Sequence, residues 1–240
     1  MKKRIDNLLL DRNYVESRAK AQGLIMAGEV AVNGKTIIKS GTLVAEDAEI
    51  TLTEPPPFVS RGGIKLNYAL DRFGTDVSLK TIADIGASTG GFTDCLLKRG
   101  ASRVYAIDVG YGQLDYRLRK DPRVTVMERQ NARYPVELPE RVDMVTMDVS
   151  FISVEKIIPS VVKLLKEDGC LIVMLKPQFE ARKKEVGKGG VIRQPVMHAR
   201  VLGRFITWVT KQDLRLKSLA ASPILGGSGN REFFVLLNLT

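Results

Sequence analysis

The chain has 240 residues, of which 44% are hydrophobic and 27% charged, a composition that excludes wholesale disorder and leaves room for one large domain or two small ones. Its 37 Lys and Arg residues outnumber its 27 Asp and Glu residues, and the resulting net charge of +10 favours a polyanionic partner over neutral metabolites. The longest apolar runs are far shorter than the roughly 20 residues of a membrane-spanning helix.

Export and metal binding are also disfavoured by the residues present. The basic start of the chain is followed by a short apolar run that stops at Leu10, which does not match an export signal. Cys95 and Cys170 fall in segments that read as core helix and core strand, so we expect buried free thiols. With a single histidine, His198, and no cysteine pair at ligand spacing, neither a zinc site nor a His-based triad can form. We expect a cytoplasmic protein without a metal and without membrane insertion.

Residues 1–54 predict a small α+β module. The apolar spacing over residues 4–12 predicts a helix, and Ser17 is a suitable N-cap for a second helix that runs to about residue 28. Alternating valines at 30 and 32 and the Asn33-Gly34 pair then indicate a strand and a type I′ turn, with more strand material at 37–38 and 44–52. Three consecutive prolines follow, and we predict a stiff linker over residues 55–60.

The pattern of the first module resembles the small RNA-binding domain named after ribosomal protein S4. The matching residues are Arg4-Ile5-Asp6-Asn7-Leu8-Leu9, Arg12, Ser17-Arg18-Ala19, Leu24-Ile25 and Gly28-Glu29-Val30-Ala31-Val32-Asn33-Gly34. On composition alone, a solvated pair of amphipathic helices is the favoured interpretation, because the module has eight basic and eight acidic residues. The resemblance implies that its basic helices contact RNA phosphates, through Arg4, Arg12, Arg18 and Lys20.

Residues 61–240 predict an α/β domain, because strand-like and helical segments alternate. The predicted strands are 81–85, 104–107, 124–127, 142–147, 171–175, 216–221 and 233–237, and the predicted helices are 62–73, 90–99, 111–120, 155–166 and 196–211. No helix separates the last two strands, so the final strand should run antiparallel in an otherwise mostly parallel, seven-stranded, doubly wound sheet. That arrangement resembles the Rossmann-like fold of methyltransferases.

A glycine-rich turn follows the first predicted strand, where ligands bind in such sheets. The turn lacks the second glycine of a nicotinamide fingerprint and follows an acid, Asp84, so it resembles the first motif of S-adenosylmethionine-dependent methyltransferases. The resemblance implies that S-adenosylmethionine is bound by Asp84, Gly86, Ala87, Ser88, Thr89, Gly90, Gly91 and Phe92. Asp108 closes the next strand, where a carboxylate can accept the ribose hydroxyls, and Asn131, Ala132 and Asp148 follow later strands.

Four ionisable residues are expected at or near the same edge of the sheet. Asp148 and Lys176 end strands, Glu232 opens the antiparallel strand, and Lys65 opens the helix that leads into the domain. Surface ion pairs would be the simpler interpretation. The order Lys65, Asp148, Lys176, Glu232 nevertheless resembles that of the FtsJ-like ribose 2′-O-methyltransferases. Lys176 would deprotonate the ribose hydroxyl or stabilise its alkoxide, Asp148 would orient Lys176, and Lys65 and Glu232 would position the ribose.

Both halves together resemble the TlyA family, whose members are labelled haemolysins and methylate ribose 2′-hydroxyls of ribosomal RNA, cytidine in well-characterised cases. The resemblance implies ribosomal RNA or ribosomal subunits as partners. Two other functions stay open: an RNA-binding ribosome-assembly factor without turnover, and a membrane-lytic protein, which only the label favours.

Residues 182–217 carry ten basic side chains against two acidic ones, beside the predicted catalytic lysine. We expect this segment, together with Arg61, to grip RNA phosphates. The residues of its glycine-flanked loop that we expect to bind RNA are Lys183, Lys184 and Lys188.

Overall fold

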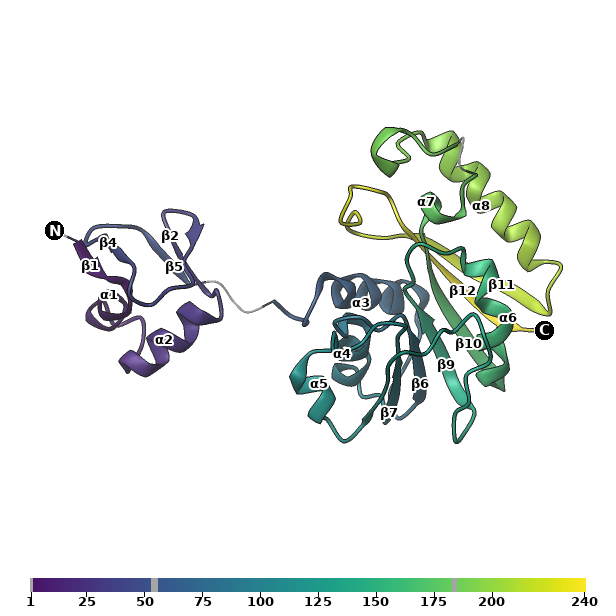
Figure 1. Ribbon diagram of the computed structural model, residues 1–240, viewed down its shortest axis with the longest axis horizontal. Helices are drawn as coiled ribbons and strands as arrows, with labels where there is room; N and C mark the ends of the chain where they lie inside the picture. Colours follow the sequence, from purple (N-terminus) through teal and green to yellow (C-terminus); the bar gives the residue numbers. More distant parts are fainter. Residues whose placement is uncertain (1, 53–55, 183–184) are drawn as a thin grey trace. The chain divides into compact units, whose positions relative to one another are not determined.

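The computed structural model of the chain describes residues 2–52, 56–182 and 185–240 (Figure 1). The chain divides into two compact units, residues 1–57 and 58–240. Phe58 and Val59 already belong to the second unit, because the Val59 amide donates to Asp94 and the Phe58 ring packs on Gly63. The expected linker at 55–60 is therefore reduced on its C-terminal side, while residue 55 lies outside the described residues.

The first unit is an α+β module with a short apolar core. Its elements are β1 (Lys2–Arg4), α1 (Ile5–Asp11), α2 (Arg18–Met26), β2 (Val30–Val32), β3 (Lys35–Thr36), β4 (Leu43–Ala45) and β5 (Ile50–Leu52). The Ser17 hydroxyl caps α2 by accepting from the Lys20 amide, and both Asn33 and Gly34 have positive φ angles, as the predicted turn requires. Strand β2 pairs with β3 and β5, and β1 pairs with β4.

The second unit contains a seven-stranded sheet flanked by helices. Its strands are β6 (Thr81–Ile85), β7 (Arg103–Ile107), β8 (Val124–Met127), β9 (Val142–Met147), β10 (Leu165–Leu175), β11 (Leu214–Ala221) and β12 (Phe233–Leu239). Its α-helices are α3 (Arg61–Phe73), α4 (Gly91–Lys98), α5 (Tyr116–Lys120), α6 (Ile158–Val161), α7 (Pro177–Glu180) and α8 (Pro195–Val209). The strand order is β11-β12-β10-β9-β6-β7-β8, and β12 is antiparallel to both of its neighbours. This confirms the predicted fold class.

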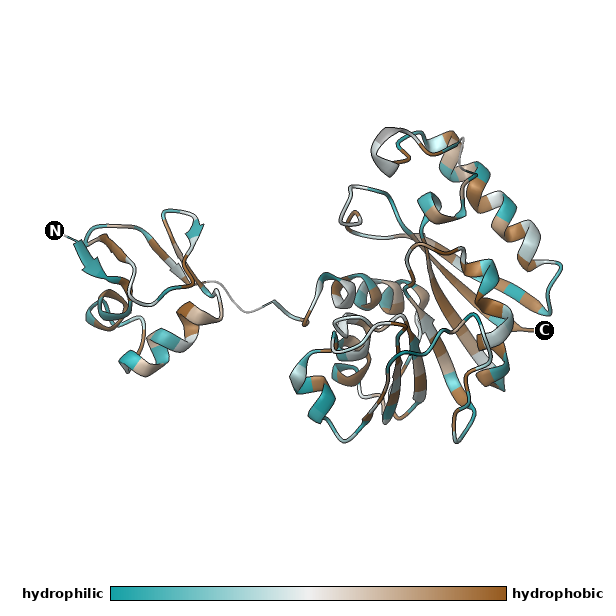
Figure 2. Ribbon diagram, in the orientation of Figure 1, coloured by the Kyte–Doolittle hydropathy of each residue, from teal (hydrophilic) through white to brown (hydrophobic). Residues whose placement is uncertain are grey.

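Alternating side chains divide the core between the two faces of the sheet. Ile82, Met144 and Phe234 pack with residues of α3 and α4 on one face, while the residues that follow them, such as Val145, pack with α6 and α8 on the other. Figure 2 shows the resulting concentration of hydrophobic residues along the central strands. Among the helices that the structure describes, none is long and apolar enough to cross a membrane.

Two predicted helices are shorter than expected. The helix predicted over 111–120 is only α5, because Asp115 caps a late start by accepting from the Arg117 amide, and the residues before it form a loop. The helix predicted over 155–166 is broken into two 3-10 turns around the single turn of α6, whose first turn contains a proline. Cys95 is buried and Cys170 half-buried, and both thiols are free.

Candidate active site

A cavity of about 500 Å³ opens at the carboxyl ends of β6, β7 and β9. Because these neighbouring strands are parallel, the loops that follow them meet at one edge of the sheet. The lining residues are Ile85, Gly86, Ser88, Ile107, Asp108, Val109, Gln113, Gln130, Asn131, Ala132, Asp148, Val149, Ser150, Phe151, Ile152 and Ile157. Six of the residues selected from the sequence as cofactor contacts therefore line one cavity, namely Gly86, Ser88, Asp108, Asn131, Ala132 and Asp148.

The glycine-rich turn between β6 and α4 is shaped by close backbone contacts. Gly86 has φ +81°, and a side chain there would overlap the carbonyl oxygen of Asp148. A side chain at Gly91 would overlap Ser60, and one at Gly90, the N-cap of α4 with φ +94°, would overlap Leu118. Glycine is therefore needed for the loop after β6 to lie against the loop after β9.

Asp84 does not line this cavity, contrary to the direct ligand contact expected from the sequence. Its side chain is fully buried and accepts hydrogen bonds from the hydroxyls of Thr93 (2.7 Å) and Thr146 (3.0 Å). Burial raises the pKa of its carboxyl to about 7. Asp84 therefore ties β6 to α4 and β9 behind the turn. Asp84 is the second-last residue of β6, and at this position the side chain faces the core and not the cavity.

Asp108 presents its carboxylate to the cavity from the end of β7. It accepts from the amides of Gly110 (2.6 Å) and Ser88 (2.8 Å), and Ser88 has a positive φ of 49°. Each carboxylate oxygen retains capacity for a further hydrogen bond. Asn131, also in the lining, accepts from the Arg133 amide, which fixes its side chain.

A second, smaller cavity of about 190 Å³ adjoins the first and shares Gly86, Ser88, Asp148 and Ser150 with it. It is also lined by the predicted catalytic lysines and by Ala87, Thr89, Gly91 and Phe92 of the turn. Ser60 and Gly62 contribute from the start of α3. The sequence analysis did not select Ser60, Gly62 or Ser150.

Two lysine–carboxylate pairs lie at this second cavity. The Lys65 Nζ is 2.5 Å from the Glu232 Oε2, and both residues are buried. The Lys176 Nζ is 2.6 Å from the Asp148 Oδ1 and donates to the Ser150 hydroxyl at 2.8 Å. Lys176 and Lys65 line the cavity, whereas Glu232 lies behind Lys65. All four residues selected from the sequence are thus brought together in pairs.

Phe151 is a site residue that the sequence analysis missed. Its side chain is 91% exposed at the first cavity, its φ is +64°, and its ring lies 5.1 Å from that of Phe179. A phenylalanine in the left-handed region is strained. The signal available in the sequence was an aromatic residue three positions after Asp148, between the predicted strand 142–147 and the predicted helix 155–166.

Most of the basic residues predicted to contact RNA in the first unit also hold the unit together. The buried Asp6 accepts from Arg4 (2.9 and 3.0 Å) and from Arg18 (3.1 Å), and the Arg4 hydrogen bonds hold the Asp6 pKa well below its usual range. Arg12 donates to the carbonyls of Ala48 and Glu46. Arg4 and Arg18 remain about half exposed, at 44% and 51%. Asp6 therefore fixes the orientation of both guanidinium groups, and the two arginine side chains still have surface accessible to solvent.

Of the other basic residues predicted to contact RNA, the structure describes the side chains of Lys20 and Arg61. Lys20 is 58% exposed and lies 3.9 Å from Glu16, and Arg61 donates to the Leu225 carbonyl. Lys183 and Lys184 lie outside the described residues, and the Lys188 side chain is not described.

The sheet topology, the glycine-rich turn after its first strand and the cavity at its carboxyl edge together define a methyltransferase of the Rossmann-like, S-adenosylmethionine-dependent fold. A solved S-adenosylmethionine-dependent methyltransferase structure from Mesorhizobium loti has this fold, with a TM-score of 0.52 at 14% identity over 71% of this chain and 95% of that one. The FtsJ-like methyltransferase family matches residues 58–239, and the S4 domain matches residues 3–50. The chain belongs to the FtsJ-like methyltransferases and, by its full-length relatives, to the TlyA family.

The relatives support this membership over nearly the full length. The chain is 42% identical over 238 residues to the 16S/23S rRNA (cytidine-2′-O)-methyltransferase TlyA of Mycobacterium tuberculosis, covering 98% of this chain and 89% of that protein. It is 41% identical over 236 residues to hemolysin A of Brachyspira hyodysenteriae, covering 96% and 97%. A solved structure from Streptococcus thermophilus, provisionally named a hemolysin, matches with a TM-score of 0.76 and 40% identity over 100% of this chain and 89% of that one. The resemblance to the TlyA family is confirmed.

Proposed function

We propose that the protein transfers a methyl group from S-adenosylmethionine to the 2′-hydroxyl of a ribose in ribosomal RNA, that of a cytidine. The observation that carries the proposal is the two lysine–carboxylate contacts, Lys65–Glu232 and Lys176–Asp148, in which every residue but the partly exposed Asp148 is buried, at a small cavity joined to a nucleoside-sized one. A surface ion pair would not need this burial. The TlyA relatives, which are named rRNA (cytidine-2′-O)-methyltransferases, support the same conclusion.

The polar groups that line the larger cavity fit S-adenosylmethionine. The Asp108 carboxylate is held by two backbone amides and keeps acceptor capacity for ribose hydroxyls. The turn at Gly86 admits a ligand against the backbone, and Asn131 and Ala132 lie where the adenine would be read. When bound, S-adenosylmethionine supplies an electrophilic methyl group on a sulfonium centre.

The smaller cavity would hold the target ribose. Its 2′-hydroxyl must lose a proton as the new oxygen–carbon bond forms, and a positioned side chain that assists this transfer accelerates a reaction by about 10²- to 10⁴-fold. Lys176 would accept that proton or, remaining charged, stabilise the alkoxide. Asp148 and Ser150 fix the Lys176 Nζ from two sides. Lys65, held by Glu232, would bind the ribose from the side of α3.

Incubation of the protein with labelled S-adenosylmethionine and ribosomal subunits tests the proposal. We expect label on a ribose, detected as one alkali-resistant linkage, and loss of label with Lys176→Ala, while S-adenosylmethionine binding measured by calorimetry is retained. RNA binding without transfer to any RNA would instead favour an assembly factor, and leakage of liposomes would favour membrane lysis.

Substrate binding would use the S4 unit and the basic segment of the methyltransferase unit. In the S4 unit, Asp6 orients the exposed guanidinium groups of Arg4 and Arg18. In the methyltransferase unit, Phe151 follows the Ser150 that accepts from Lys176, and it offers an exposed aromatic face at the larger cavity on which a base could stack. Lys183, Lys184 and Lys188 are proposed phosphate contacts from the sequence alone.

A further inference from the structure

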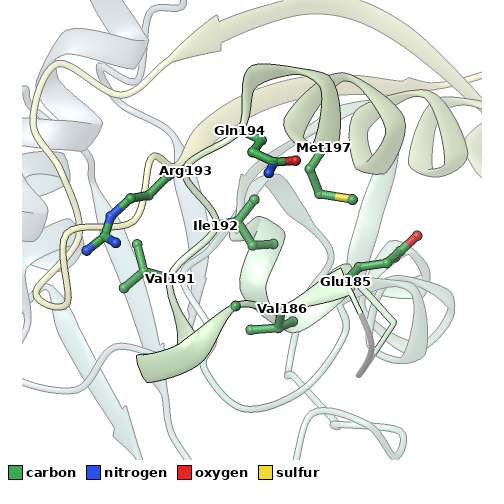
Figure 3. A pocket seen from close by; sticks show the side chains of 8 residues that line it. Glu185, Val186, Val191, Ile192, Arg193, Gln194 and Met197 are labelled. Atoms are coloured by element: carbon green, nitrogen blue, oxygen red, sulfur yellow. The ribbon is translucent and has the colours of Figure 1, made fainter.

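A third cavity, of about 410 Å³, lies outside the two cavities of the candidate active site. It is an open cavity between residues 185–187 and the start of α8 (Figure 3). Its lining residues are Glu185, Val186, Gly187, Val191, Ile192, Arg193, Gln194 and Met197. Its volume is in the range of cavities that hold small organic groups.

One wall of this cavity is held rigidly by two buried side chains. Asn230, which is 2% exposed, accepts from the Ile192 amide at 2.9 Å and donates to the Gly190 carbonyl at 3.0 Å. The His198 Nε2–H donates to the Ile192 carbonyl at 2.9 Å, and the His198 ring packs edge-on against Phe233. Because both backbone groups of Ile192 are bonded, the wall is formed before any ligand arrives.

The lining combines apolar surfaces with one neutral hydrogen-bonding group. In Figure 3 the side chains of Val186, Val191, Ile192 and Met197 surround the centre, while those of Arg193 and Glu185 point outward on opposite sides. The Gln194 amide at the edge offers a donor and an acceptor. Flat apolar faces with a polar edge are the features of a nucleobase, and methionine sulfur packs well against aromatic rings.

The charges around the cavity suit a polyanion. Glu185 is the one carboxylate of the lining, and it is neutralised by two hydrogen bonds of 2.8 Å from Arg204 and a third from the Arg182 amide, which lower its pKa to about 2. Arg182, whose amide makes that contact, is exposed, and so is Arg193 on the opposite side of the cavity. A phosphate backbone entering the cavity would therefore meet cations and no free carboxylate.

Asn230 also links this cavity to the proposed catalytic residues through the chain. Asn230 lies two positions before Glu232, so their Cα atoms are about 7 Å apart in extended chain. Glu232 pairs with Lys65 at the smaller cavity. One short segment thus holds both the wall at Ile192 and the Lys65–Glu232 pair, so the third cavity and the smaller cavity are supported by the same stretch of chain.

We propose that this cavity binds a nucleobase of the RNA substrate, from a nucleotide next to the one that is methylated. The proposal rests on the RNA-methylating function above. The base would lie between Val186 and Met197, its polar edge would contact Gln194, and its phosphates would contact Arg193. The cavity would select the sequence context of the target rather than take part in methyl transfer.

Filling the cavity tests this proposal. In methylation assays on ribosomal subunits, Met197→Trp is expected to raise the KM for the subunit about tenfold, the effect of losing one stacked base. The kcat and the affinity for S-adenosylmethionine should stay unchanged. Val196→Trp is the matched control, because Val196 is adjacent in α8, 70% exposed and not part of the lining. Equal KM values for the two variants would overturn the proposal.

A crosslink provides a second measurement that does not depend on turnover. The photoreactive residue benzoylphenylalanine placed at position 197 should crosslink to one base within a few nucleotides of the methylated ribose, mapped by reverse transcription. Crosslinks spread over remote sites, or none, would contradict the assignment. If the wild-type protein methylates no RNA, the proposed function fails, and a single strong crosslink would still show a base at the cavity.

Discussion

The Lys176 Nζ lies 2.6 Å from the Asp148 Oδ1, and each residue directly follows a parallel strand of the same sheet. Because β9 and β10 are neighbours, the two side chains leave the sheet side by side. Their contact is therefore a direct product of strand order and not of loop conformation. The Asp148 carboxylate is also part of the lining of both active-site cavities, so it touches both proposed binding regions.

Asp148→Asn should lower kcat for RNA methylation by about 10²-fold or more, because Lys176 loses the charge that orients it. The rate is measured with saturating S-adenosylmethionine. Asp143→Asn is the control: Asp143 is near the opposite end of β9 and pairs with the exposed Lys166. A similar loss of rate in both variants would remove Asp148 from the proposed mechanism.

Lys65→Met should lower the free energy of unfolding by about 3–5 kcal/mol, because it leaves Glu232 charged and buried. The double variant Lys65→Met/Glu232→Leu should recover a large part of that loss while remaining inactive. Urea denaturation of both variants measures the difference. If the single and double variants are equally stable, the pair is not coupled as the structure indicates.

Gly86→Ala should weaken S-adenosylmethionine binding and lower the Tm, because its methyl group would overlap the Asp148 carbonyl. Gly112→Ala is a matched control, since Gly112 also has a positive φ (+72°) but has open space around it. The control should show only the conformational cost of about 1–2 kcal/mol. Binding titrations and thermal unfolding of both variants separate overlap from backbone strain.

Asp84 should make the stability of the methyltransferase unit depend on pH. Its pKa of about 7 in the folded state exceeds the usual value of 3.8, so the folded state binds an extra proton between these values. The contribution of Asp84 to stability is therefore complete below about pH 4 and is lost as the pH rises towards 7. Relative to the wild type, Asp84→Asn should gain stability from pH 5 to pH 7. Parallel Tm curves for the two proteins would contradict this.

The strands and the pairing of Lys65 with Glu232 and of Lys176 with Asp148 could be predicted because they depend on local pattern and strand order. The runs at 81–85 and 142–147 are buried on both faces, so their apolar residues mark them clearly. Asp84 was assigned to the wrong side of the turn because strand periodicity does not tell which end residue faces the ligand. Phe151 depends on an unusual backbone conformation, and the Asn230–Ile192 contact joins segments 38 residues apart, so neither has a local signal.

Strand β12 lies between β11 and β10, although it is the last strand of the described chain. The contact that it makes possible, between Lys65 and Glu232, joins residues 167 positions apart. Closing so long a loop is entropically costly and slow compared with local contacts. We therefore expect the glycine-rich turn and the Asp148–Lys176 pair to form while the chain is still incompletely folded. Methyl transfer should appear only in the last kinetic phase of refolding, after most of the helical signal has been recovered.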